Sequence, residues 1–364
     1  MTLLIPLGLV VLLEASLHLC GVGYDTQFFL NTPSGEAFVP NDHFAWQFFS
    51  RKTGARPDYF ILPARKDPSS VRIFVLGESA AMGAPAPSFG FSRILEVMLN
   101  RRYPDKKCEI YNVAMHGINS HIIRPIALEC LEHQADLLII YMGNNEASSL
   151  SNHGVPGARL FEDHVHLTFD GNHLLAQLVY PVVTRSLADR LGHISSKGQS
   201  LPSAAECDEA LAFTLWDHFN VESAIVQQMS MPPFTGLLDH SRHQAVREAA
   251  LQAGRAVLTP QDLHQCLKCY ETALQARPQV WKLRYNLGLF YQEMNQPAAA
   301  MRELEPVVQA FPQIAPFRLP LAAALAAIGQ RETALSHLQE AARLEPELRG
   351  LQQMRLQLQN GSRK

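Results

Sequence analysis

The chain of 364 residues is long enough for two domains, and a hydrophobic content of 47% excludes a disordered protein. A formal net charge of -3 gives no basic surface, which argues against nucleic acid as a partner. The six cysteines lack disulfide or zinc-ligand spacing, so the sequence predicts neither a metal site nor a cofactor.

The first segment, residues 1–22, is predicted to be a hydrophobic helix that anchors the chain in a membrane. The apolar run from Leu3 to Val22 is just long enough to span a bilayer, and it leaves the side of the membrane open. Glu14 and His18 lie on one helical face and would be costly in lipid. A buried or interfacial helix in a cytoplasmic protein is therefore the alternative.

Residues 23–70 are rich in Pro, Gly and aromatic residues and show little periodicity. Because the aromatic side chains between Phe38 and Phe49 offer large apolar surfaces, we expect an irregular segment that wraps onto a core.

Residues 71–194 alternate short apolar runs with amphipathic stretches, a pattern typical of a parallel sheet covered by helices. The predicted strands are Val71–Leu76, Cys108–Val113 and Asp136–Tyr141, and the predicted helices are Phe91–Arg102, Ser120–His133 and Leu174–Val183. Nothing between Ala147 and Glu162 reads as a buried strand, so we expect a short, incomplete sheet. Each predicted strand ends beside glycine and small polar residues, and in a parallel sheet these ends meet at one edge.

The C-terminal part carries a 34-residue period, seen in Gly288 and Ala322, Leu304 and Leu338, and Pro312 and Pro346. Small residues inside each repeat and a terminal proline are typical of tetratricopeptide repeats, which form an α-helical solenoid. The predicted divisions are a linker with helices over 195–246, three repeats over 247–347, and a capping helix and tail over 348–364. Cys266 and Cys269 fall on packing positions of a helix.

Polar residues that suit nucleophilic catalysis follow the three predicted strands. Ser79 follows the first strand, the Gly117 backbone the second, and the Asn145 amide the third. A nucleophilic serine needs a base that takes its proton, and the base needs a carboxylate that orients it. His166 offers the base and Asp163, three residues earlier, offers the carboxylate. Glu162 and Asp170 are rival carboxylates for the role of Asp163.

Four blocks of the sequence resemble, in order, those of the SGNH (GDSL-like) hydrolase family: Gly77-Glu78-Ser79, Asn112 to Gly117, Gly143-Asn144-Asn145-Glu146 and Asp163-x-x-His166. The resemblance implies an α/β three-layer, flavodoxin-like fold that hydrolyses esters through an acyl-serine. It implies Ser79 as nucleophile, His166 as general base and Asp163 as its orienter. The implied oxyanion donors are the N–H groups of Ser79 and Gly117 and the side chain of Asn145.

The whole layout also resembles membrane-anchored bacterial proteins that join such a domain to tetratricopeptide repeats. The implied partners are an acylated small molecule or glycan as substrate and a protein or peptide on the repeats. An α/β-hydrolase is disfavoured because its nucleophile turn needs glycine where this chain has Ala81. The alternatives to a hydrolase or acyl transferase are a degenerate hydrolase fold acting as a scaffold and a peptide-binding repeat protein.

Overall fold

The computed structural model describes residues 8, 11–13, 15–17, 23–50, 55–143, 160–163, 165–194, 198–231, 234–236 and 240–360. Most of the predicted membrane anchor, with Glu14 and His18, lies outside these residues. Within the described part of the chain, no helix combines the length and apolar character needed to cross a bilayer.

The aromatic-rich segment is more regular than predicted. It forms a small antiparallel sheet of β1 (Phe29–Asn31), β2 (Ala37–Pro40) and β3 (Leu62–Pro63), with a 3-10 turn at Phe44–Gln47. The short strands carry no clear alternation, which is why the sequence pattern misses them. The expected aromatic packing is present, since Phe28 and Phe44 are buried edge to face at 5.2 Å.

The central sheet contains the three predicted strands, all parallel, in the order β5-β4-β6. They are β4 (Ser70–Gly77), β5 (Lys107–Asn112) and β6 (Leu137–Tyr141). Every residue of β4 is buried, whereas β6 is half-exposed and, among the described residues, pairs only with β4. Within the part of the chain that the structure describes, the sheet contains the three predicted strands and no further one.

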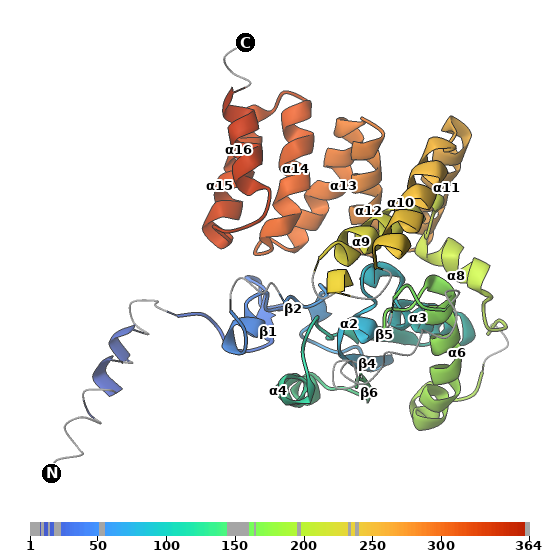
Figure 1. Cartoon of the computed structure of the whole chain (residues 1–364). Helices are drawn as coiled ribbons and strands as arrows, with labels where there is room; N and C mark the ends of the chain where they lie inside the picture. Colours follow the sequence, from blue (N-terminus) through green and yellow to red (C-terminus); the bar gives the residue numbers. More distant parts are fainter. Residues whose placement is uncertain are drawn as a thin grey trace.

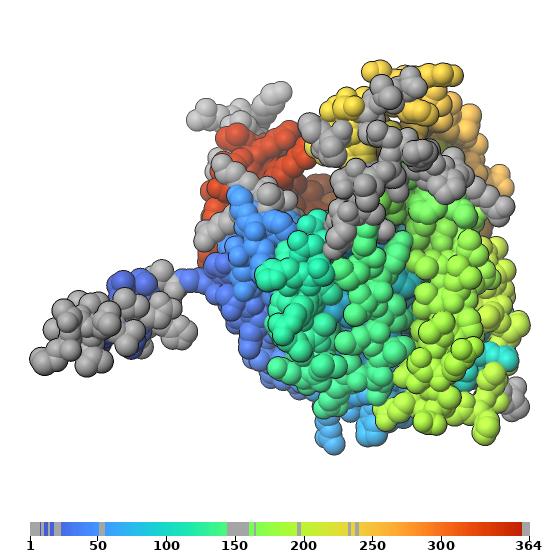
Figure 2. All heavy atoms as spheres, turned by 60° about the horizontal axis from the view of Figure 1, so that its bottom comes forward, coloured from blue at the N-terminus to red at the C-terminus, as the bar shows by residue number. Residues whose placement is uncertain are grey.

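Helices cover both faces of this sheet and make three layers (Figure 1). On one face, α3 (Phe91–Arg102) and α6 (Phe169–Ser186) pack against Val71, Ile73 and Val75. On the other face, α4 (Ser120–Glu132) and the aromatic segment pack against Phe74 and Leu76. Figure 2 shows α4 and α6 reaching the surface on either side of the β6 edge.

The C-terminal half of the chain is helical (Figure 1). Its elements are α7 (Ala188–Leu191), α8 (Ala204–Leu211), α9 (Leu215–Met229), a 3-10 turn at Phe234–Gly236, α10 (His240–Ala256), α11 (Pro260–Ala276), α12 (Trp281–Glu293), α13 (Pro297–Ala310), α14 (Ala315–Ala327), α15 (Arg331–Leu344) and α16 (Leu351–Asn360).

Two of the three predicted repeats are regular helical hairpins. Helices α12 and α14 begin 34 residues apart, as do α13 and α15, so α12–α13 and α14–α15 are successive tetratricopeptide units. Within the first hairpin Gly288 allows a close approach, because a Cβ there would lie 2.6 Å from Leu304. The first predicted repeat differs, since α10 packs on α9, with Gly254 against Phe219.

The N-terminal segment joins the sheet domain to the repeats. Lys282, in the first turn of α12, pairs with Asp58 at 2.5 Å, and both side chains are about nine-tenths buried. Tyr59 packs edge to face on Phe317 of α14 at 5.0 Å. Arg56, two residues before Asp58, forms an ion pair with Glu345, which directly follows α15. One segment therefore contributes to the apolar cores on both sides.

Candidate functional site

At the carboxyl end of β4, two residues before the candidate nucleophile Ser79, the backbone leaves room only for glycine. Gly77 has φ +151, and a Cβ there would lie 1.9 Å from the carbonyl oxygen of Tyr141. This contact brings the ends of β4 and β6 together. Because β5 and β6 flank β4 on opposite sides, the tip of β4 is the kind of point where open α/β sheets bind ligands.

Ser79 begins the short helix α2 (Ser79–Met82) directly at this tip and is 8% exposed. Asn112, at the end of β5, holds that helix in place through side-chain hydrogen bonds. Its buried amide donates to the carbonyl oxygens of Ala81 and Met82 at 2.9 and 3.3 Å, and its own carbonyl accepts from Ala114. The sequence marks Asn112 as part of a block but does not reveal this positioning contact.

Asp163 and His166 form one compact turn. The Nδ1 atom of His166 lies 2.6 Å from Oδ2 of Asp163. The other carboxylate oxygen accepts the N–H groups of Val165 and His166, each at 2.8 Å. Burial acts to raise the pKa of Asp163, but the hydrogen bond from His166, its charge and the two N–H groups outweigh it and lower the pKa to about 2.

The two rival carboxylates have other surroundings. Glu162 pairs with Arg247 of α10 at 3.5 Å, and that guanidinium also donates to the backbone carbonyl of Glu162. Asp170 lies in the first turn of α6 and is exposed. Of the three candidates, Asp163 is the carboxylate that contacts His166, and Arg247 is a contact that the sequence does not reveal.

The other ring nitrogen of His166, Nε2, is buried, and none of the described residues forms a hydrogen bond with it. Ser79 and this nitrogen are therefore not hydrogen-bonded here. Desolvation by the surrounding protein, and then the charge of His166, lower the pKa of His116, a residue just after β5. Asn172 also ties the backbone of Leu167 to the start of α3 at Phe91.

The proposed oxyanion donors are described only in part. Gly117 has φ +66 and is exposed, with open space where a Cβ would be. Asn145, with Asn144 and Glu146, lies outside the described residues. At the third strand tip, the Gly143 N–H donates to the buried carboxylate of Glu78 at 3.3 Å.

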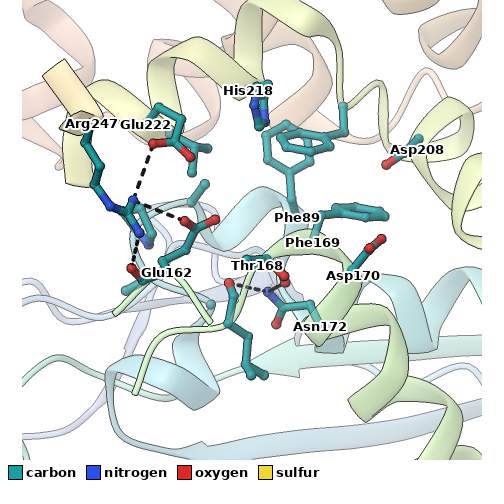
Figure 3. Close-up of a pocket in the computed structure, with 17 residues that line it drawn as sticks. Phe89, Glu162, Thr168, Phe169, Asp170, Asn172, Asp208, His218, Glu222 and Arg247 are labelled. Carbon is teal, nitrogen blue, oxygen red and sulfur yellow. Dashed lines mark hydrogen bonds and ion pairs between the residues drawn. The ribbon is translucent and has the colours of Figure 1, made fainter. Parts of the chain in front are cut away.

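A cavity of about 400 Å³ opens beside the Asp163–His166 turn (Figure 3). Residues on both sides of the turn, Glu162 and Leu167, line it together with the loop that follows α2, from Gly83 to Phe89. Helices α8, α9 and α10 also line it, through Asp208, Glu222 and Arg247. A small molecule could therefore reach the neighbourhood of the turn from this cavity.

No protein-family model and no curated protein matches the chain. A crystal structure of MamA matches 24% of this chain and half of its own length, at 24% identity and a TM-score of 0.23. The first TPR domain of Spaghetti (RPAP3), bound to an HSP90 peptide, matches 29% of this chain and 82% of its own, at 17% identity and a TM-score of 0.27. The TPR2AB domain of yeast Sti1 matches 54% of this chain and 85% of its own, at 14% identity and a TM-score of 0.24. The assignment of the repeats rests on the helix spacing described above.

Proposed function

We propose that the sheet domain is a serine ester hydrolase of the SGNH type, which cleaves or transfers an acyl group. The observation that carries this proposal is the buried Asp163–His166 pair, whose Nε2 atom has no protein partner among the described residues. A buried imidazole with an oriented Nδ1 and an unused Nε2 suits a general base. Ser79, at the tip of β4, is the serine that we assign to this base.

In this mechanism the Oγ atom of Ser79 attacks the ester carbonyl, and its proton passes to Nε2 of His166. The carboxylate of Asp163 stabilises the resulting imidazolium. The imidazolium then returns the proton to the departing alcohol, which leaves an acyl-serine. Water, or an acceptor alcohol, attacks the acyl-serine by the same route, and Ser79 is regenerated. Because catalytic hydrogen bonds are often long or absent before substrate binds, we expect the Ser79–His166 hydrogen bond to form in the substrate complex.

A fluorophosphonate probe tests the proposal without knowledge of the substrate. We expect the probe to label the wild-type chain, to fail with Ser79→Ala, and to react about 10²–10⁴ times more slowly with His166→Ala. Ser120→Ala, which removes the hydroxyl of an exposed serine at the start of α4, is the matched control and should label normally. Labelling that persists in Ser79→Ala would refute the assignment.

A protein-binding scaffold is the second candidate, and the stacked hairpins α12–α13 and α14–α15 favour it. Such solenoids bury a continuous core and present extended surfaces that bind peptides. In that case the sheet domain is catalytically inactive. Folded wild-type protein that resists the probe, and that captures the same partner as Ser79→Ala, would support the scaffold over the hydrolase.

A further inference from the structure

A second cavity, of about 670 Å³, lies at the junction between the sheet domain and the repeats. Residues of β5 and α3 line it, together with residues 58–61 of the joining segment and residues 279–282, which lead into α12. The exposed residues Lys107 and Gln279 are part of the lining, so a ligand has access from the surface. Junctions between domains are frequent ligand sites.

Five consecutive residues of β5, from Cys108 to Asn112, line this cavity. The side chains of a strand alternate between the two faces of its sheet, and those of Ile110 and Tyr111 belong to the apolar cores on opposite faces. Consecutive residues therefore line one cavity together where the cavity follows the edge of the strand. Among the described residues only β4 pairs with β5 in this sheet, so the other edge of β5 has no neighbouring strand.

The backbone groups of β5 also alternate, between β4 and this edge. The N–H of Val113 donates to Val75 of β4 at 2.9 Å, which directs the backbone groups of residues 109 and 111 to β4 as well. Cys108 faces the edge. Its N–H donates to the side chain of Asn100 on α3 at 3.0 Å, and its carbonyl accepts from the same side chain at 2.9 Å. Asn100 thus takes the place of a neighbouring strand at one residue.

By the same alternation, Ile110 and Asn112 direct their backbone N–H and carbonyl groups to the edge. None of the described residues forms a hydrogen bond with these four groups. Both residues are buried, at 6% and 4% exposure. Beyond them the edge is closed again, because Met115 forms an isolated antiparallel bridge with Pro57. Buried backbone groups without a partner are rare, so this gap favours a ligand that both donates and accepts hydrogen bonds.

The side chains around the cavity carry an uncompensated positive charge. Three of the four basic side chains in the lining have an acidic partner: Arg93 pairs with Glu96, Lys107 with Glu109 at 2.7 Å, and Lys282 with Asp58 at 2.5 Å. The fourth, Arg277 at the end of α11, has no carboxylate within ion-pair distance among the described residues. Burial, followed by the charge of Arg93, lowers the pKa of Arg277, which indicates that the two guanidinium groups are neighbours. A bound carboxylate would compensate this charge.

We propose that the edge of β5 binds a short extended segment of a partner protein, which pairs with Ile110 and Asn112 and places an acidic side chain at Arg277. An added strand offers N–H and carbonyl groups at the spacing of the edge, and its alternate side chains reach the walls. A neutral ligand would leave the charge of Arg277 uncompensated. The inference goes beyond ester hydrolysis and does not depend on it, and it places the peptide at β5 and not on the helical hairpins.

A display library of random heptapeptides, selected on the full chain, supplies the probe. We expect the enriched peptides to carry Val, Ile or Thr at alternate positions around one Asp or Glu, as an added strand beside a basic wall requires. Replacement of that acidic residue by its amide should weaken binding at least tenfold, and N-methylation of the neighbouring residues should abolish binding. Failure to enrich any peptide, or enriched peptides without this pattern, would overturn the inference.

Arg277→Met separates a binding role from a structural one. The variant removes a partly buried charge that has no acidic partner, so it should melt no lower than the wild type. Calorimetry should show at least a tenfold loss of affinity for the selected peptide. Arg255→Met, which replaces an exposed arginine on α10, is the matched control and should bind normally. Unchanged affinity in Arg277→Met, or a lower melting temperature, would contradict the assignment of Arg277 to the peptide.

Hydrogen exchange of individual amides, followed by NMR, tests whether the peptide lies on this edge. In the free protein we expect the amide of Ile110 to exchange at least about tenfold faster than that of Tyr111, which faces β4. The selected peptide should slow exchange at Ile110 and Asn112 to the rate seen at Tyr111. Equal protection of Ile110 and Tyr111 in the free protein would mean that the edge is already paired or hydrated, and unchanged exchange after peptide addition would place the peptide elsewhere. Either result refutes the inference.

The outcome is separate from that of the hydrolase proposal. Ser79→Ala should bind the selected peptide as the wild type does, and Arg277→Met should react normally with the fluorophosphonate probe. Loss of peptide binding in Arg277→Met would therefore support the edge site whatever the result at Ser79.

Discussion

Asp163 contacts its histidine through both the backbone and the ring, which fixes the imidazole in one orientation. The contacts arise from a four-residue turn in which one carboxylate oxygen caps two backbone N–H groups and the other faces Nδ1. Such a turn needs only the local sequence to form. The orientation of His166 is therefore set by contacts within the protein itself.

The first prediction concerns the acid dependence of this turn. Because the pKa of Asp163 is lowered from 3.8 to about 2, ionised Asp163 stabilises the fold above pH 4, and this stability is lost as the pH falls towards 2. Asp163→Asn should lower the free energy of unfolding by about 2 kcal/mol at pH 6 and by about half of that at pH 3. Urea unfolding at both pH values measures it. Asp189→Asn is the comparison, and a loss that does not vary with pH would contradict the prediction.

Sequence spacing could predict the Asp163–His166 pair because both residues lie in one turn. It could not separate Asp163 from Glu162, since that choice depends on Arg247, which is 85 residues away along the chain. The raised pKa of Asp208 also depends on residues that are distant in the sequence, because it requires α8 to pack beside the first turn of α6. Local patterns carry no information on such distant neighbours.

Among the elements, the tip of β4 depends on a close backbone contact with β6. Gly77→Ala would drive a Cβ into the carbonyl of Tyr141, so we expect a loss of at least about 3 kcal/mol in the free energy of unfolding. Gly117→Ala is the matched control: its φ is also positive, but the space is open, and about 1–2 kcal/mol is expected. Urea unfolding of the two variants compares these losses, and equal losses would show that strain in φ outweighs the contact.

The Asp163–His166 turn also has a contact from the helical half of the chain. Arg247 of α10 donates to the carbonyl of Glu162, and the Glu162 N–H donates to the carbonyl of His166 at 2.8 Å. We expect Arg247→Ala to speed hydrogen exchange of the amides of Glu162 and His166 and to slow fluorophosphonate labelling about tenfold. Arg247→Lys should recover part of both. Arg255→Ala, an exposed arginine on the same helix, should change neither. Unaltered exchange in Arg247→Ala would show that the turn is stable without this contact.

At the scale of the whole molecule, the segment that contains Asp58 and Tyr59 lies between the sheet domain and the repeats. Lys282→Met removes one partner of a buried ion pair and leaves the carboxylate of Asp58 without its cation, which should cost about 3–5 kcal/mol. In differential scanning calorimetry we expect one transition in the wild type to separate into two. Asp58→Asn combined with Lys282→Met should restore much of the loss, because no unpaired charge remains. A variant as stable as the wild type would mean that the pair contributes little to the junction.

The layers and the repeats follow from periodicity, so the sequence predicts β4, β5, β6 and α3 to within about one residue at each end, and the 34-residue spacing of the regular hairpins. The junction between the sheet domain and the repeats does not follow from periodicity. Asp58 and Lys282 are 224 residues apart, and neither lies in a stretch whose pattern reveals a partner. The small sheet β1-β2-β3 is missed for a similar reason, because its strands are too short to show alternation.

The joining segment has a consequence for how the protein is made. Arg56 precedes its partner Glu345 by 289 residues, so it leaves the ribosome long before the last hairpin exists. At about 5–20 residues per second, the interval lasts on the order of tens of seconds. For most of that time the side of Tyr59 that packs on Phe317 has no partner. A nascent chain stalled before α14 would therefore leave this aromatic surface exposed.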